Sequence, residues 1–252
     1  MTRKVIAFLL LTMGSHAPLA SSAAGWPPDI EAGQVVAEFA RQLRASGLVR
    51  RCFVQSTLNS SLGSTTEERG TVLLSVPGRM RWDYASGKVL VASDDNLVFY
   101  LPEERLAYVG SYAEASGTQI GLLLLAGATE VDKAIDAAWA RAWTPLAGLW
   151  RLELRDRSEA SSPEPARISV DLTPLPELEL RAVRVEDAYG NRTEILLSKC
   201  PRDADQSEST FAFSLPQGTE VVDFAGNPVP KAPESTRDSG VEAPRRSGEA
   251  IQ

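Results

Sequence analysis

Residues Gly70–Tyr84 read Gly-Thr-Val-Leu-Leu-Ser-Val-Pro-Gly-Arg-Met-Arg-Trp-Asp-Tyr, and this stretch decides the fold. The Pro77–Gly78 pair is a strong turn signal between two segments with strand-like composition. In the second segment charged and large apolar side chains alternate, which places the two kinds on opposite faces of a strand. The stretch therefore predicts two antiparallel strands joined by a turn, with Met80, Trp82 and Tyr84 pointing inward.

Short strands of the same kind are predicted on both sides of this pair. Turn residues, mainly Pro, Gly, Asp and Asn, separate them at regular intervals. The predicted strands are 49–58, 69–76, 79–84, 89–92, 97–101 and 105–109, then 150–155, 167–172, 179–186, 192–198, 210–214 and 220–222. Such regular spacing is typical of an antiparallel meander that curls into a sandwich or a barrel.

Helical spacing of apolar residues occurs before and between the two series of strands. The first helix is expected from Pro27 to Ser46, with Pro near its first position and a glycine after its end. Between the series, the apolar run Ile120–Leu125 and the segment Thr129–Ala142 predict two short helices. Such helices fill a core by default, and over a cavity they would act as a movable lid.

The composition disfavours several classes of chemistry. The chain has 26 Lys and Arg against 33 Asp and Glu, for a net charge of −7, and no basic stripe of the kind that nucleic-acid binders carry. The only histidine is His16, in a segment that we expect to be removed. A Ser-His-Asp centre and a histidine zinc site are then excluded, whereas Lys, Tyr and carboxylate chemistry remain. We expect no catalytic residue, no metal, no cofactor and no nucleic-acid partner.

The N-terminus has the three parts of a cleaved signal peptide. A basic start is followed by an apolar run from Val5 to Met13 and by small residues up to Gly25. The apolar run is too short for a membrane-spanning helix, which needs ~20 residues. Cleavage is expected near residues 23–24, so residues 1–24 are predicted to be a signal peptide and the remainder to be exported.

Cys52 and Cys200 are the only cysteines of the chain. An even number of cysteines in an exported protein favours a disulfide, because the compartment is oxidising. Cys52 lies in the first predicted strand and Cys200 follows a late one, so a bent sheet would bring them together. We predict a disulfide between them; two buried free thiols are the alternative.

Four segments, taken in order, resemble the LolA-like family of periplasmic lipoprotein carriers. Gly70–Tyr84 is similar to the family's strand, proline turn and aromatic strand, and Asp95–Tyr100 (DNLVFY) to its next conserved-looking aromatic segment. Asp187–Thr193 (DAYGNRT) is similar to its hairpin, and Phe211–Val221 (FAFSLPQGTEV) to its terminal Phe-rich segment. The resemblance covers roughly residues 32–223. It indicates a single carrier domain over residues 25–224, followed by a tail over 225–252 whose polar composition predicts disorder.

The resemblance implies an incomplete, strongly bent antiparallel β-barrel with an N-terminal helix and short lid helices. It implies a periplasmic monomer that takes the acyl chains of lipoproteins from an inner-membrane transporter to an outer-membrane receptor. Exposing acyl chains to water costs ~0.8 kcal/mol per CH₂, so crossing an aqueous space requires an apolar shelter. Alternatively, a relative of this kind carries another lipid, such as a glycolipid, or acts through a protein partner as an envelope-stress sensor. An enzyme built on a similar sheet is the third possibility.

The expected lipid-binding residues follow from strand alternation and from the resemblance. The predicted cavity consists of Phe53, Met80, Trp82, Tyr84, Val91 and Phe99, and the predicted lid of Leu122, Leu123 and Leu124. The alternative is that these side chains simply fill a core. One position departs from the family pattern: Val76 stands where well-studied carriers have an arginine that helps to hold the lid shut.

Overall fold

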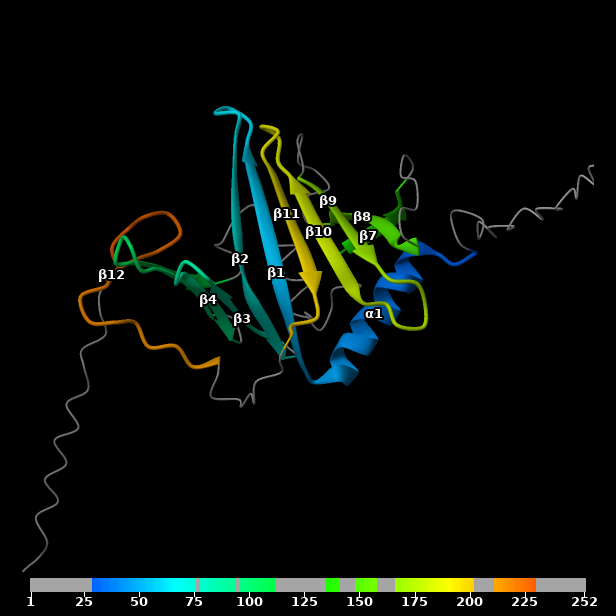
Figure 1. Cartoon of the computed structure of the whole chain (residues 1–252), viewed down its shortest axis with the longest axis horizontal. Helices are drawn as coiled ribbons and strands as arrows, with labels where there is room; N and C mark the ends of the chain where they lie inside the picture. The colour runs from blue at the N-terminus through cyan, green and yellow to red at the C-terminus, as the bar shows by residue number, and fades with distance from the viewer. Residues whose placement is uncertain are drawn as a thin grey trace, which may run out of the picture.

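The computed structural model describes residues 29–75, 78–93, 96–111, 135–140, 148–157, 166–201 and 211–229. Over these ranges the chain forms one helix and a twelve-stranded sheet that curls without closing (Figure 1). The elements are α1 (Ala32–Ser46), β1 (Leu48–Asn59), β2 (Ser64–Ser75), β3 (Arg79–Tyr84), β4 (Val89–Ser93), β5 (Asn96–Leu101), β6 (Leu106–Ser111), β7 (Ile135–Trp139), β8 (Trp150–Asp156), β9 (Arg167–Leu172), β10 (Leu180–Glu186), β11 (Arg192–Ser198) and β12 (Glu220–Val222).

The helix α1 begins later than its sequence pattern predicts. Glu31 has an extended backbone, with φ −66° and ψ 137°, so it precedes the first turn and its carbonyl oxygen accepts from the amides of Gln34 and Val35. The helix ends at Ser46 because Gly47 has a φ of 67°, a conformation that glycine adopts at little cost.

The sheet consists of two meanders that meet at β1. The strand order is β12-β6-β5-β4-β3-β2-β1-β11-β10-β9-β8-β7, so β2 and β11 are the two neighbours of β1. These pairings are antiparallel except for β12 and β6, which pair in parallel at one edge. The edges β12 and β7 are different strands at opposite ends of the order, which leaves the sheet open.

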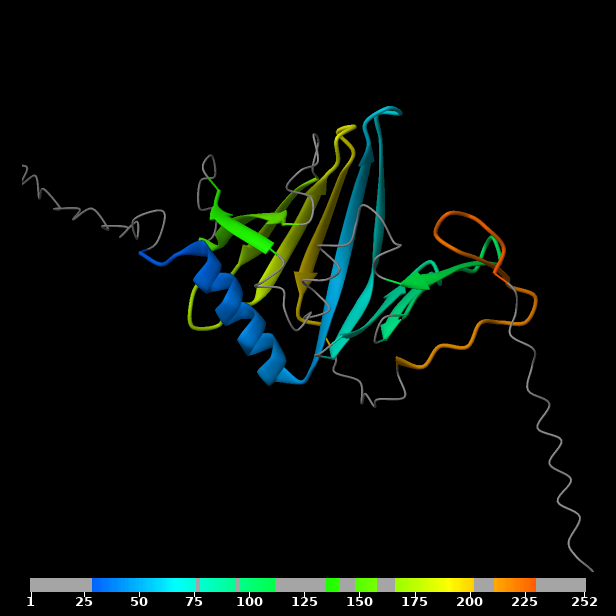
Figure 2. The same ribbon diagram turned by 180° about the vertical axis from the view of Figure 1, so that it is seen from behind.

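Strand register defines the two faces of the sheet. Val72 on β2, Trp82 on β3 and Leu90 on β4 lie side by side, and they belong to the same buried cluster as the apolar side of α1. We call this side the inner face; Figure 2 shows α1 in front of it. The neighbouring positions, Leu73 and Arg81 among them, alternate to the outer face.

The inner face carries the main hydrophobic core. Val35 and Val36 of α1 pack onto β7–β10, and aromatic and aliphatic side chains continue the same cluster across β1–β5. The fully buried large side chains of this core include Met80, Trp82, Leu152, Leu172, Leu178 and Val183. The predicted class, a mainly β protein with a bent, incomplete barrel and an N-terminal helix, is confirmed.

The helix predicted from Thr129 to Ala142 is wrong where the structure describes that segment. Residues Ile135–Trp139 form β7, which pairs antiparallel with β8. Ile135, Ala137 and Trp139 alternate toward the core, and Asp136 is exposed between them. The spacing of these apolar residues is compatible with a helix and with a strand. The strand forms because the segment can pair with the edge of β8. Leu122, Leu123, Leu124 and Val76 lie outside the described residues.

The predicted strand over 210–214 is also wrong in its described part. Phe211 and Phe213 lie against the outer face instead, where the guanidinium groups of Arg79 and Arg81 stand 5.3 and 5.7 Å from their ring centroids. The Phe213 ring also contacts Tyr100. These side-chain contacts, rather than a backbone ladder, hold the segment.

The ordered chain extends past the predicted start of the tail. The amide of Val229 donates to the Val221 carbonyl oxygen at 2.9 Å. Asp223 closes the intervening turn, since its carboxylate accepts from the backbone amides of Ala225 and Asn227. The sequence boundary at Ala225 therefore falls inside a folded turn.

A disulfide joins Cys52 on β1 to Cys200, just after β11. It is the pairing expected from the cysteine count, and it spans 148 residues of sequence. The bond lies where the two meanders meet, because Cys52 is also in register with Ser198.

Candidate functional site

An aromatic cluster occupies the middle of the inner face. The Phe53 ring meets the edges of Trp82 and Tyr84, with centroid separations of 4.8 and 5.0 Å. Met80 is fully buried in the same core, and Phe99 packs against it from β5. Five of the six residues predicted to line a cavity therefore share one face and one cluster.

Val91 is the exception, and its predicted inward orientation is wrong. On β4 it pairs with Arg81 of β3 and Val98 of β5, positions that alternate to the outer face. It is buried there rather than beside Trp82. The error arises because β4 is apolar at four successive positions, Val89–Ala92, and alternation then gives no sign of which side points inward.

The aromatic cluster holds one polar atom without a partner. The Trp82 side chain is 1% exposed, and its indole Nε1 has no hydrogen-bond acceptor within the described part of the chain. Trp139, at the other end of the sheet, instead donates from Nε1 to the Ile30 carbonyl oxygen at 2.9 Å. Buried donors are nearly always paired, so the Trp82 N–H marks a special position in this face.

The cluster becomes polar at its Tyr84 end. The Tyr84 hydroxyl lies 3.2 Å from Gln55 Oε1, to which it donates. Burial raises the pKa of Tyr84 well above its ordinary value, and the nearby negative charge of Glu68 adds to the effect. The hydroxyl is therefore neutral throughout the physiological range, and Lys88, which is paired with Glu68, lies over its ring.

The helix α1 fills the other part of the inner face. Between it and β8–β10 lies an apolar crevice of about 10 Å³, lined by Val36, Phe39, Leu152, Leu154, Val170, Leu172 and Leu180. This volume holds at most about one water molecule, so an acyl chain has room there only if α1 moves. Two hydrogen bonds fasten the ends of the helix region, from Trp139 to Ile30 and from Gln42 Nε2 to the Pro176 carbonyl oxygen at 2.8 Å.

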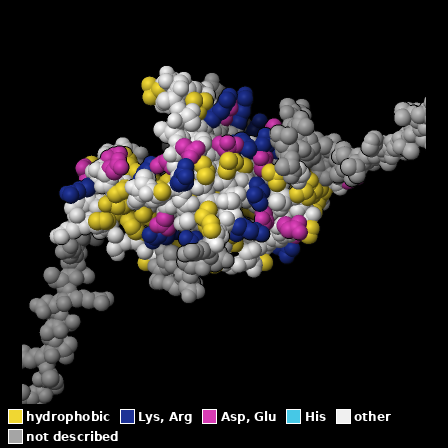
Figure 3. Space-filling model, in the orientation of Figure 1, with side chains coloured by type: hydrophobic (Ala, Val, Ile, Leu, Met, Phe, Trp, Pro, Cys, Tyr) yellow, Lys and Arg dark blue, Asp and Glu magenta, His cyan; other side chains and the backbone are white. Residues whose placement is uncertain are grey.

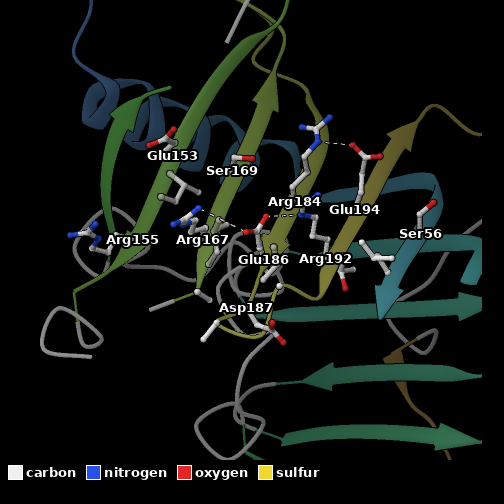
Figure 4. Close-up of a pocket in the computed structure, with 18 of the residues that line it drawn as sticks. Ser56, Glu153, Arg155, Arg167, Ser169, Arg184, Glu186, Asp187, Arg192 and Glu194 are labelled. Atoms are coloured by element: carbon white, nitrogen blue, oxygen red, sulfur yellow. Dashed lines mark hydrogen bonds and ion pairs between the residues drawn. The ribbon is translucent and has the colours of Figure 1, made fainter. Parts of the chain in front are cut away.

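A larger and open pocket of about 1380 Å³ lies at the end of β7–β11 (Figure 4). None of the six predicted cavity residues is among the described residues that line it. Several of its charged groups pair with one another: Arg184 donates to Glu194 at 2.6 Å, and Arg192 to Glu186 at 2.7 Å. These pairs leave a mixed polar surface, as Figure 3 also shows for the side of the sheet away from α1.

Beside this pocket, Asp171 is buried between two arginines. Its carboxylate accepts from Arg151 Nε at 2.6 Å and from Arg184 Nη1 at 2.9 Å. Burial by itself would raise the pKa of Asp171, but the two arginines outweigh it and hold the pKa below its ordinary value of 3.8. This network was not predictable from the sequence, because Asp171 interrupts a run of strand residues like any outward-facing position.

Two hairpin tips meet at one end of the sheet. In the β1–β2 turn, the Ser60 amide donates to Asn191 Oδ1 at 3.0 Å, and the Ser60 hydroxyl donates to the Tyr189 carbonyl oxygen at 2.6 Å. Leu62 and Tyr189 project from these tips with 77% and 81% exposure. The sequence predicted the Asp187–Asn191 loop but not its contact with the first hairpin.

In the described ranges, no helix has the length and apolarity needed to cross a bilayer. The same ranges hold no group of three or more His, Cys, Asp or Glu side chains arranged to bind a metal ion.

Comparison with known proteins yields one family. The sequence model "Outer membrane lipoprotein carrier protein LolA" matches residues 48–214. An outer-membrane lipoprotein carrier protein of Dechloromonas aromatica is 26% identical over 68% of this chain and 78% of its own length. One of Chromobacterium violaceum is 26% identical over 77% of this chain and 96% of its own length. A LolA superfamily protein of Nitrosomonas europaea is a structural neighbour with a TM-score of 0.45 and 12% identity, over 73% of this chain and 98% of its own.

Proposed function

The chain belongs to the LolA family of outer-membrane lipoprotein carriers, and from this membership we propose that it shelters lipoprotein acyl chains on the inner face of its sheet. The family is one of carriers, not of enzymes. In the proposed function, the chain works in the periplasm after loss of residues 1–24. As a monomer, it receives its cargo from an inner-membrane transporter and delivers it to an outer-membrane receptor.

The single observation that supports this proposal best is the composition of the inner face. From Phe53 on β1 to Phe99 on β5 it presents aromatic and aliphatic side chains, and α1 continues that surface over β7–β10. An acyl chain is held by apolar area alone, at roughly 25 cal/mol per Å² buried, so it needs no charged partner. The open polar pocket, by contrast, is lined by charged side chains that include the Arg184–Glu194 ion pair.

Binding requires a rearrangement of the inner face. Trp82 and Met80 are already removed from solvent, so an incoming chain must replace the groups that now cover them. The helix α1 is suited to such a movement, because it rests on the sheet mainly through apolar side chains, and an acyl chain offers the same kind of contact. We propose that Leu122, Leu123 and Leu124 contribute to this cover.

The alternatives are less well supported. A carrier of another lipid would use the same inner face, and a sensor would add a protein partner. The curated relatives are named as lipoprotein carriers, which favours the carrier.

The test is a titration of purified protein with a fluorescent fatty acid and with a triacylated lipopeptide. Wild-type protein is expected to bind both, and Trp82→Asp and Leu123→Asp are expected to lose at least about tenfold in affinity, because a buried unpaired carboxylate is heavily penalised. Leu62→Asp is the matched control, since Leu62 is exposed at a hairpin tip. Denaturant unfolding of each variant shows whether it is folded.

The carrier proposal is contradicted if the inner face behaves as a packed core that binds no lipid. In a packed core, Trp82→Ala costs about 3–5 kcal/mol. If wild-type protein binds neither ligand and Trp82→Ala unfolds the chain, the inner face is ordinary core and the carrier proposal fails. Crosslinking of the exported protein in cells then identifies its partners: lipoproteins and their transporter for a carrier, or a signalling membrane protein for a sensor.

A further inference from the structure

The unpaired indole N–H of Trp82 calls for an explanation that an apolar surface alone does not provide. Phenylalanine would fill much of the same space without burying a donor, and leaving a buried donor unpaired costs free energy. The fold is able to pair a tryptophan, as the Trp139 bond to Ile30 shows. The position is therefore suited to an acceptor that the described residues do not supply.

The surroundings of Trp82 restrict the chemistry of that acceptor. Its neighbours across the strands are Val72 and Leu90, and the Phe53 ring lies 4.8 Å from its own. The cations on the same strand, Arg79 and Arg81, lie on the outer face against Phe211 and Phe213. Lys88 lies over the Tyr84 ring, but it is already paired with Glu68. A carboxylate buried beside Trp82 would thus find no free counter-ion among the described residues, which is strongly unfavourable. A neutral acceptor, such as a carbonyl oxygen, meets no such penalty.

The other polar group of the aromatic cluster, the Tyr84 hydroxyl, does not compete with Trp82 as a hydrogen-bond donor to the ligand. The Tyr84 hydroxyl already donates to Gln55 at the edge of the aromatic group. Trp82 therefore supplies a donor within an apolar surface, next to strands along which a methylene chain would lie. A ligand that fits has one neutral carbonyl group followed by a long apolar tail.

We propose that Trp82 Nε1–H donates a hydrogen bond to the carbonyl oxygen of an ester- or amide-linked acyl chain, and so fixes where the chain begins on the inner face. This inference rests on the proposed function, because it presupposes that the inner face binds acyl chains. It adds a specificity: the site distinguishes an acylated lipid from an alkyl lipid of equal length. In the free protein none of the described residues pairs with this donor, and the bound ligand satisfies it.

The experiment uses two lipids that differ only in the carbonyl group. The ester is 1-palmitoylglycerol, and the ether is 1-O-hexadecylglycerol, which has a chain of the same number of carbons. Wild-type protein is expected to bind the ester roughly tenfold more tightly than the ether, the effect of one buried hydrogen bond. Trp82→Phe is expected to bind both equally, with its affinity for the ether near the wild-type value.

Two controls separate the hydrogen bond from changes in packing. Trp139→Phe removes an indole that is already paired within the protein, so it should keep the wild-type preference for the ester. Incorporation of β-(3-benzothienyl)alanine at position 82 keeps the bicyclic shape and removes only the N–H. This variant should lose the preference even if Trp82→Phe fails to fold.

The outcomes are distinguishable. A wild-type protein that binds ester and ether equally, or a preference that survives the loss of the N–H at position 82, overturns the inference and leaves the carrier proposal intact. A wild-type protein that binds the lipopeptide but neither glycerol lipid overturns the inference alone. A wild-type protein that binds none of these ligands overturns both.

Discussion

Gly70 lies directly opposite Phe53 on the paired strands β2 and β1, and the phenyl ring occupies the space that a side chain at Gly70 would need. A Cβ atom at position 70 would stand 2.9 Å from both Cε1 and Cζ of Phe53 and closer still to the Asp83 carbonyl oxygen. Real Cβ atoms essentially never approach so closely. The glycine thereby lets the Phe53 ring reach Trp82 and Tyr84.

Gly70→Ala should therefore destabilise the protein by about 1–3 kcal/mol, because the backbone oxygen of Asp83 cannot move aside as a flexible side chain would. The free energy of unfolding in denaturant measures this. Gly33→Ala is the matched control: Gly33 lies in α1 with open space around it, so alanine should be neutral or stabilising by up to about 1 kcal/mol. Equal stability of Gly70→Ala and wild type would contradict the packing described for Phe53.

Asp171 should make stability depend on acid pH. Its folded-state pKa lies below the ordinary value of 3.8, so its contribution is fully present above that value and is lost as the pH falls through the folded-state pKa. At pH 7, Asp171→Asn should cost about 1–3 kcal/mol, because both arginines lose a charged acceptor. The difference from wild type should shrink below about pH 4.

The measurement is the unfolding free energy of both proteins between pH 7 and pH 2. Asp136→Asn serves as the control, since the Asp136–Arg157 pair is exposed and should contribute at most about 1 kcal/mol. A constant difference between Asp171→Asn and wild type across the whole range would mean that the Asp171 charge does not stabilise the fold.

The strands around the Pro77–Gly78 turn were predictable because one face of each is buried and the other is not. In β3, Arg81 and Asp83 separate Met80, Trp82 and Tyr84, so alternation alone gave both the strand and its inward side. The same pattern supplied the core of the candidate site.

The wrong predictions have a common physical cause: in each case the interaction that determines the local structure is made with a segment distant in the sequence. The face of the sheet on which Val91 lies is set by its register with Arg81 of β3. The segment Ile135–Trp139 forms a strand because the edge of β8 is available for pairing. Phe211 and Phe213 looked like strand residues, but their rings pair with arginines of β3. Whether the Trp82 indole N–H finds an acceptor depends on all the residues that surround it in the fold, and a single sequence does not show which residues these are.

The disulfide should be present in nearly every exported molecule. Thiol titration of the denatured, unreduced protein should find none of the two cysteines reactive. Replacing both with serine should lower the unfolding free energy by up to about 4–5 kcal/mol on the chain-entropy argument, since the bond spans 148 residues. Two reactive thiols per chain would show that the bond does not form.

Truncation should locate the end of the folded domain. A chain that ends at Val229 keeps the bond from its amide to Val221 and the turn at Asp223, so its melting temperature should match that of the full chain. A chain that ends at Phe224 loses both and should melt several degrees lower. If the Val229 truncation also melts lower, residues beyond it stabilise the fold.

Because the two meanders meet at β1, the chain can be divided into two fragments, each containing one meander. A single cut between β6 and β7 would leave one piece with β1–β6 paired and one with β7–β11 paired. The two pieces would be joined by the β1–β11 ladder, the β12–β6 pair, the packing of α1 on the later strands and the bond from Cys52 to Cys200. The pieces interlock, because the later one supplies partners to both β1 and β6 of the earlier one. We therefore expect two separately expressed halves to reassemble, and the proposed acyl-chain binding to return only when the halves have met.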